Sequence, residues 1–165
     1  MNAEIQKKLV ALADEAGMNV ESAQNMPPSF CGCQHTQAPI AIIDPNQPQH
    51  EQIFTFLHEL GHFVLHYKHS HPVRMPWYLN RPYKNEILGE AAYATRRALR
   101  LKLGKEWQAD LWAMCLFCQL GCPDDLKAFL KQHPEKRPLF YLAVVGHVKT
   151  RIGKSIHKLF HLYTV

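Results

Sequence analysis

The stretch FLHELGHFVLH, residues 56–66, places two histidines four positions apart, with a glutamate directly after the first. On an α-helix, side chains four residues apart lie on the same face, about 6 Å apart along the axis. His58 and His62 can therefore converge on one metal ion, with Zn–N bonds of about 2.1 Å. Glu59 points in an adjacent direction, where it can act as the general base for water at the metal.

The alternative for this stretch is a helix whose histidines hydrogen-bond to neighbours or to solvent. It is disfavoured because the surrounding residues are apolar, and buried polar side chains without partners are costly. His66 extends the histidine stripe, but it lies about 12 Å along the axis from His58, too far for both to bind one ion. We therefore expect His66 either to contact a ligand or to face the substrate.

A zinc ion held by two histidines needs another protein ligand and keeps one position for water. A third histidine six residues after His62 would be one solution, but Lys68 occupies that position. A glutamate from a later helix is another, and KEWQADLWAMCLF, residues 105–117, supplies Glu106. Asp110, one turn further on, can accept a hydrogen bond from the free N–H of a ligating histidine.

A second carboxylate pair, Glu86 and Glu90, is also four residues apart and lies closer in sequence to the histidines. We interpret it as the charged edge of a surface helix, because Arg96 and Arg97 follow. Glu106 instead lies on an apolar segment, where a charge needs a partner. Glu106 is thus the expected third ligand, with Glu86 as the alternative.

These segments together resemble the ImmA/IrrE family of metallopeptidases, zincins of the gluzincin type whose third ligand is a glutamate. The resemblance covers roughly residues 38–120 and is carried by IAIID (40–44), FTFLHELGHFVLH (54–66) and EWQADLWAMCLF (106–117). The last is similar to the family's Glu-x-x-Ala-Asn/Asp-x-Phe-Ala segment, with Trp112 in the aromatic place.

The resemblance implies a small zincin-like α+β domain with one catalytic Zn²⁺ per chain. His58, His62 and Glu106 would be its ligands, Glu59 the base, and Asp110 a carboxylate that orients a ligand. It also implies cytoplasmic proteolysis of a helix-turn-helix transcriptional repressor, in phage, mobile-element or stress-response circuits.

Hydrophobic periodicity and turn residues predict a mostly helical domain with a short antiparallel sheet beside the active-site helix. A single domain is expected over residues 1–165, with a core at about 38–122. The expected helices are 3–16, 49–67, 87–103, 105–121, a short one from Pro123 and a basic one at about 139–163. The segments SFCGCQ and APIAIID are expected to form a hairpin.

Residues 69–84, HSHPVRMPWYLNRPYK, contain three prolines and show no helical or strand periodicity, so they are predicted to form a long loop. Trp77, Tyr78 and Tyr83 either line a substrate cleft or pack the loop onto the core. A donor for the oxyanion is expected from a tyrosine or histidine, with Tyr78, Tyr83, His66 and His147 as candidates.

The five cysteines are an odd number in a chain large enough to fold without disulfides, which favours reduced thiols. We expect these side chains to pack in the core rather than to bind metal: Cys31, Cys33, Cys115, Cys118 and Cys122. No apolar run approaches the roughly 20 residues needed to span a membrane, and the N-terminus does not resemble a secretory signal. The sequence thus predicts a cytoplasmic protein.

The formal net charge of +5 is concentrated near the C-terminus, where no acidic residue follows Glu135. The basic residues there are Lys136, Arg137, Lys149, Arg151, Lys154 and Lys158. Such a segment can contact nucleic acid or an acidic partner, but we interpret it as a solvated helix face.

Two functions remain. The first is a zinc-dependent metallo-endopeptidase that cleaves a cytoplasmic protein such as a helix-turn-helix repressor. The alternative is a non-catalytic metal-binding module that docks a regulator or nucleic acid through the basic C-terminal helix.

Overall fold

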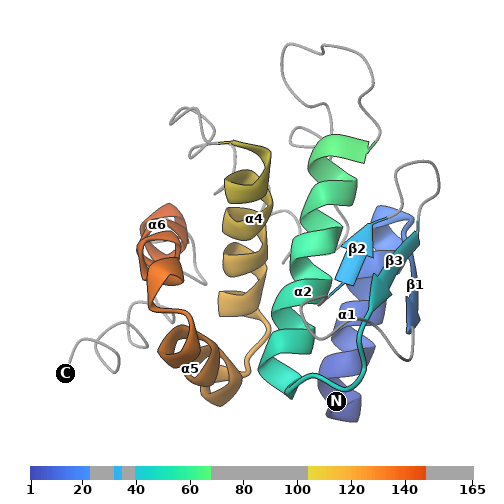
Figure 1. Cartoon of the computed structure of the whole chain (residues 1–165), viewed down its shortest axis with the longest axis horizontal. Helices are drawn as coiled ribbons and strands as arrows, with labels where there is room; N and C mark the ends of the chain where they lie inside the picture. The colour runs from blue at the N-terminus through green and yellow to red at the C-terminus, as the bar shows by residue number, and fades with distance from the viewer. Residues whose placement is uncertain (23–31, 35–39, 68–103, 148–165) are drawn as a thin grey trace.

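The computed structural model of the protein describes residues 1–22, 32–34, 40–67 and 104–147 (Figure 1). Several expectations fall outside these ranges. They are Cys31, the loop 69–84 with Trp77, Tyr78 and Tyr83, Glu86, the helix 87–103 with Glu90, and the tail beyond residue 147.

Helix α1 (Ala3–Ala16) begins and ends where the sequence predicts. The Asn2 side chain accepts a hydrogen bond from the Glu4 backbone N–H at 2.8 Å, which caps the first turn. Gly17 ends the helix in the left-handed conformation, with φ of 78°, where a glycine carries no steric penalty. Ile5, Leu9 and the other apolar residues of the stripe are buried against the rest of the core.

The sheet has three short strands in the order β1-β3-β2: β1 (Asn19–Ser22), β2 (Gly32–Gln34) and β3 (Ile40–Ile43). β2 and β3 pair antiparallel, with Gly32 opposite Ile43, as the hairpin prediction requires. β1, however, pairs parallel to β3, with Asn19 opposite Ile40, so the prediction of an antiparallel sheet was wrong. The sequence did not predict strand β1, because its residues, NVES, are exposed throughout and lack the alternation of apolar residues that identifies a strand.

Helix α2 (Gln49–His62) lies between the sheet and α4 (Lys105–Gln119), as Figure 1 shows. The helix predicted over 49–67 is confirmed, but its last turn, Phe63–Tyr67, is a π-helix, η1. Composition does not distinguish a π turn from an α turn, so the sequence could not reveal it. On α4, the run from Ala109 to Cys118 is buried on every side, because α2 and α6 cover opposite faces.

Helices α2 and α4 lie close together at Gly61, within the histidine motif. A Cβ atom at this position would lie 3.1 Å from both the Cα and the carbonyl oxygen of Ala109, and 3.2 Å from Trp112 Cδ1. Two of these three neighbours are backbone atoms, which cannot rotate away. The glycine therefore lets the two helices pack at a separation that any other residue would increase.

The last described elements of the chain are α5 (Pro123–Gln132), the 3₁₀ turn η3 (Pro134–Lys136) and α6 (Arg137–His147). As predicted, α5 begins at a proline and turns Leu126, Phe129 and Leu130 inward. The helix expected from about residue 139 begins at Arg137 and packs against α4. Within the described ranges, every helix is too short or too polar to cross a bilayer.

Cys115, Cys118 and Cys122 are free thiols in the core, as predicted for these three positions. Burial raises the pKa of the Cys118 thiol well above its usual value, with the neighbouring Cys115 and Cys122 adding to the effect. Burial likewise raises the pKa of Cys122 to about 11. Both groups are therefore protonated at neutral pH, which makes them poor nucleophiles and poor metal ligands.

We predict that Gly61→Ala destabilises the protein by up to about 2 kcal/mol, because the gain in helix propensity of about 1 kcal/mol offsets only part of a clash of about 1–3 kcal/mol. Urea unfolding measures the change. Gly104→Ala is the control, because its Cβ would meet no atom of the described residues within 4 Å. Equal or greater stability of Gly61→Ala would show that α2 and α4 do not need this close contact.

We also predict that Cys118 resists alkylation by iodoacetamide in the native protein at pH 8, where its raised pKa leaves almost no thiolate. In urea, where the pKa returns to about 8.5, the same residue should react readily. Mass spectrometry of the peptides gives both rates. Equal rates in the two conditions would contradict the buried position.

Candidate metal centre

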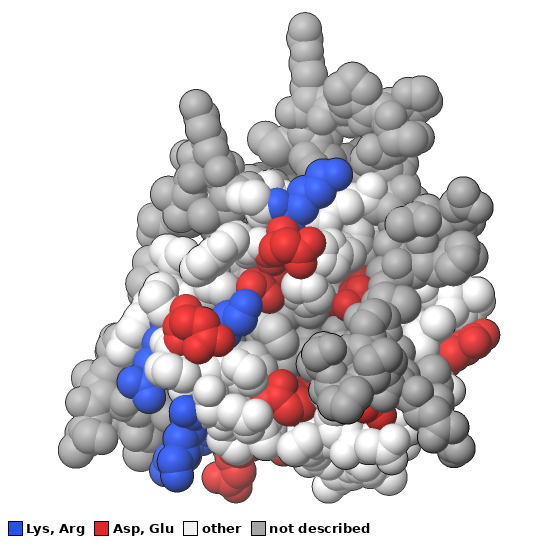
Figure 2. Space-filling model, viewed as in Figure 1, with Lys and Arg blue, Asp and Glu red and all other residues white. Residues whose placement is uncertain are grey.

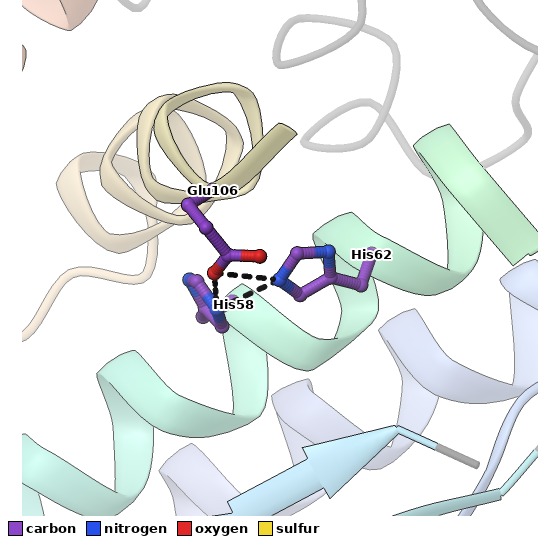
Figure 3. A group of neighbouring side chains, drawn as sticks. All are labelled: His58, His62 and Glu106. Atoms are coloured by element: carbon purple, nitrogen blue, oxygen red, sulfur yellow. Dashed lines mark hydrogen bonds and ion pairs between the residues drawn. The ribbon is translucent and has the colours of Figure 1, made fainter. Parts of the chain in front are cut away.

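Three side chains from two helices meet at the surface between α2 and α4 (Figure 3). His58 and His62 come from one face of α2, and Glu106 reaches them from the first turn of α4. The His62 Nε2 atom lies 2.9 Å from His58 Nε2 and 3.2 Å from Glu106 Oε2. The remaining pair, His58 Nε2 and Glu106 Oε2, is 3.5 Å apart.

These distances fit a small tetrahedral ion. Ligands about 2.1 Å from a tetrahedral Zn²⁺ lie about 3.4 Å from one another, so the three donor atoms can share one ion with little movement. Two imidazole nitrogens and one carboxylate oxygen are also a donor set that zinc accepts. Glu106 is 73% exposed, so this side of the site is open to water.

The position of Glu106 is favourable for a negative charge even before a metal binds. It lies in the first turn of α4, where the unpaired backbone N–H groups and the helix dipole stabilise a carboxylate. The two histidines face it from α2. Bringing the carboxylate to this place therefore costs little beyond ordering its side chain.

The ring of His58 is oriented by Asp110, which lies one turn after Glu106 on α4. The His58 Nδ1 atom is 2.9 Å from Asp110 Oδ1. Because an ionised carboxylate can only accept a hydrogen bond, His58 Nδ1 carries the proton. The neutral ring then presents the lone pair of Nε2 toward His62 and Glu106, which is the form that binds a metal.

Asp110 is buried, at 5% exposure, and its second oxygen accepts a hydrogen bond from Lys136 Nζ. Burial alone would raise the pKa of Asp110, but the hydrogen bonds from His58 and Lys136 outweigh it and lower the pKa. Burial also works to lower the pKa of His58, but the hydrogen bond to Asp110 and the negative charges of Asp110, Glu59 and Glu106 together overcome it, so the pKa is raised. A proton and a metal ion therefore compete for His58.

His62 is oriented in a comparable way, through His66. His62 Nδ1 lies 3.0 Å from His66 Nδ1, and His66 Nε2 lies 3.4 Å from Gln108 Oε1. With the Gln108 oxygen as acceptor, His66 carries its proton on Nε2, and its Nδ1 accepts from His62. The lone pair of His62 Nε2 then faces the other two donors.

Burial supports this arrangement of the two rings. It lowers the pKa of His62, with the charge of His58 adding to the effect. It also lowers the pKa of His66 to about 4, so His66 is neutral at physiological pH. Of the two expectations for His66, contact with a ligand is thus favoured over a position facing the substrate.

Glu59 follows His58 on α2 and is 6% exposed. Its negative charge is one of the influences that raise the pKa of His58. The carboxylate therefore acts on the site electrostatically, and it comes from the same helical turn as the first of the two histidines.

The contact between Lys136 and Asp110 was not predicted. Lys136 was expected to lie in a solvated basic segment, but its side chain is only 26% exposed and ends at a buried carboxylate. No sequence signal marks it, because the lysine follows Asp110 by 26 positions and sits among other charged residues. The remaining candidates Trp77, Tyr78, Tyr83, Glu86 and Glu90 lie outside the described residues, as does the side chain of His147.

We predict about one zinc ion per purified chain, lost in His62→Ala and Glu106→Ala and retained in Glu86→Ala. Because Glu106 is largely exposed, its replacement should leave the fold intact, so the loss would report on ligation. Metal content is measured by mass spectrometry and folding by circular dichroism. Zinc lost with Glu86 but kept without Glu106 would move the third ligand to the segment before α4.

Comparison with known proteins adds independent support for the histidine motif. Residues 13–93 match the peptidase family described as the IrrE N-terminal-like domain. The matched range includes His58, Glu59 and His62 and ends before Glu106. No curated protein and no solved structure matches the chain. The family match over residues 13–93 supports the assignment of the chain to the ImmA/IrrE family of metallopeptidases.

Proposed function

We propose that the protein is a zinc-dependent metallo-endopeptidase, with one Zn²⁺ held by His58, His62 and Glu106. The observation that carries this proposal is the triangle formed by His58 Nε2, His62 Nε2 and Glu106 Oε2, with sides of 2.9, 3.2 and 3.5 Å. Glu59 lies in the same helical turn as His58. The family match supports a metallopeptidase, and therefore a metal, in general. The donor set and its spacing support zinc as the metal.

A zinc ion with three protein ligands and one open position lowers the pKa of water and polarises a carbonyl oxygen. In the proposed reaction, the Glu59 carboxylate takes a proton from the attacking water as the new C–O bond forms at the peptide carbonyl. The same group then delivers this proton to the amide nitrogen as the C–N bond breaks. Because Glu59 is nearly buried, bulk water competes little for that proton.

The remaining residues of the site position these groups. Asp110 and His66 hold the two histidines in the tautomers that present Nε2. The exposed side of Glu106 leaves an approach from solvent, which an endopeptidase needs for a polypeptide. A donor for the oxyanion is then expected from Tyr78, Tyr83 or His147, since the ring of His66 is engaged with His62.

For the substrate, we propose a cytoplasmic protein such as a helix-turn-helix repressor, as the resemblance to the ImmA/IrrE family implies. Figure 2 shows basic and acidic side chains of the described residues interspersed on one face. The alternative is a non-catalytic module that docks a regulator or nucleic acid through the basic C-terminal helix. Its basic residues Lys149, Arg151, Lys154 and Lys158 lie outside the described residues. The next experiment distinguishes a catalytic peptidase from a module that holds a metal without catalysis.

We predict that Glu59→Gln keeps about one zinc per chain and lowers peptide cleavage by a factor of roughly 10²–10⁴, the usual contribution of a general base. Cleavage of a proteome-derived peptide library, read by mass spectrometry, measures activity without a known substrate. Glu51→Gln is the matched control, because it makes the same change two turns away on α2.

Equal cleavage by Glu59→Gln and the wild type would show that another group is the base. A wild-type protein that holds zinc but cleaves no peptide would instead favour the metal-holding module.

A further inference from the structure

The Asp110 carboxylate is shared between two charged or polar partners on opposite sides. One oxygen lies 2.9 Å from His58 Nδ1, and the other accepts from Lys136 Nζ. A carboxylate bonded through one oxygen alone can rotate about its Cβ–Cγ bond. With both oxygens engaged in a buried site, its plane is fixed, and so is the direction from which it holds the His58 ring.

Lys136 is held at this place by packing from two helices. Its ammonium lies 5.9 Å from the centre of the Phe54 ring on α2. That ring in turn stacks on Phe129 of α5, with ring centres 4.1 Å apart. The Lys136 backbone N–H donates to the His133 carbonyl at 3.0 Å, which closes the turn η3. The lysine is thus presented to Asp110 by the segment that links α5 to α6.

We propose that Lys136 is a positioning residue of the metal centre, acting through Asp110 to hold His58 in the orientation that binds the ion. This rests on the proposed function to the extent that His58 is a ligand. It extends the centre to a segment outside residues 13–93, the range that matches the family. Partners of this kind commonly change metal affinity by about 10–100-fold when they are removed.

A purely structural ion pair is the competing explanation, and stability alone does not separate the two. Replacing a buried ion pair by apolar groups is often nearly neutral for folding, whereas removing one partner is destabilising whether or not a metal site is nearby. Zinc affinity distinguishes the two explanations. If the ion pair were purely structural, the effect of Lys136 on zinc affinity would not depend on Asp110. A double-mutant cycle isolates that coupling.

The experiment measures the zinc dissociation constant of the full chain by competition with a chromophoric chelator. The variants are Lys136→Met, Lys136→Arg, Asp110→Asn and the double variant Lys136→Met/Asp110→Asn. Lys131→Met is the control for loss of one positive charge, because this lysine is exposed on α5. Circular dichroism and urea unfolding of the metal-free proteins report folding separately, and Lys136→Gln replaces Lys136→Met if the latter does not fold.

We expect Lys136→Met to weaken zinc binding by about 10-fold or more, Lys136→Arg to restore most of the affinity, and Lys131→Met to leave it unchanged. In the Asp110→Asn background, Lys136→Met should have no further effect. Wild-type affinity in Lys136→Met, or an equal loss with and without Asp110, would overturn the inference while leaving the proposed function in place. A wild-type chain that binds no zinc would overturn both.

Discussion

The packing of α2 against α4 at Gly61 is the constraint on which the rest of the site depends. Two ligand candidates come from α2 and one from α4, so the separation of the two helices sets the distance between the donor atoms. A Cβ atom at position 61 would press on the backbone of Ala109, which lies between Glu106 and Asp110 in sequence. The glycine therefore serves the core and the site through the same contact.

The buried charges of the site are balanced by partners from other elements of the fold. Asp110 would be costly in the core by itself, but His58 from α2 and Lys136 from η3 both donate to it. His62 has an equivalent partner in His66, from the π-helical turn that follows it. His58 and His62 thus each have one ring nitrogen hydrogen-bonded to the protein and the other turned toward Glu106. A histidine that binds a metal needs this arrangement.

Much of this arrangement could be predicted from the sequence, because it depends on short-range periodicity. The four-residue spacing of His58 and His62 places them on one face of a helix. Glu106 lies at the start of an otherwise apolar helix, where a charged side chain is expected to have a partner. The structure brings their donor atoms within 4.8 Å of one another. The caps of α1 and the proline that opens α5 were equally local signals.

What the sequence could not predict depends on contacts between distant segments. The parallel pairing of β1 with β3 has no local signature, because the strand carries no apolar alternation. Lys136 resembles any surface lysine until the turn after α5 is folded back against α2. The contribution of Gly61 likewise becomes visible only once Ala109 and Trp112 lie against it.

The unequal exposure of the three donors has a consequence for how an ion would enter and leave. The histidines are half-buried and held by partners, whereas the Glu106 side chain is 73% exposed on the first turn of its helix. An ion can therefore meet a preformed pair of nitrogens from the solvent side, with the carboxylate closing over it afterwards. Exchange of the metal would then need only the swing of one surface side chain, while the interface between α2 and α4 stays closed.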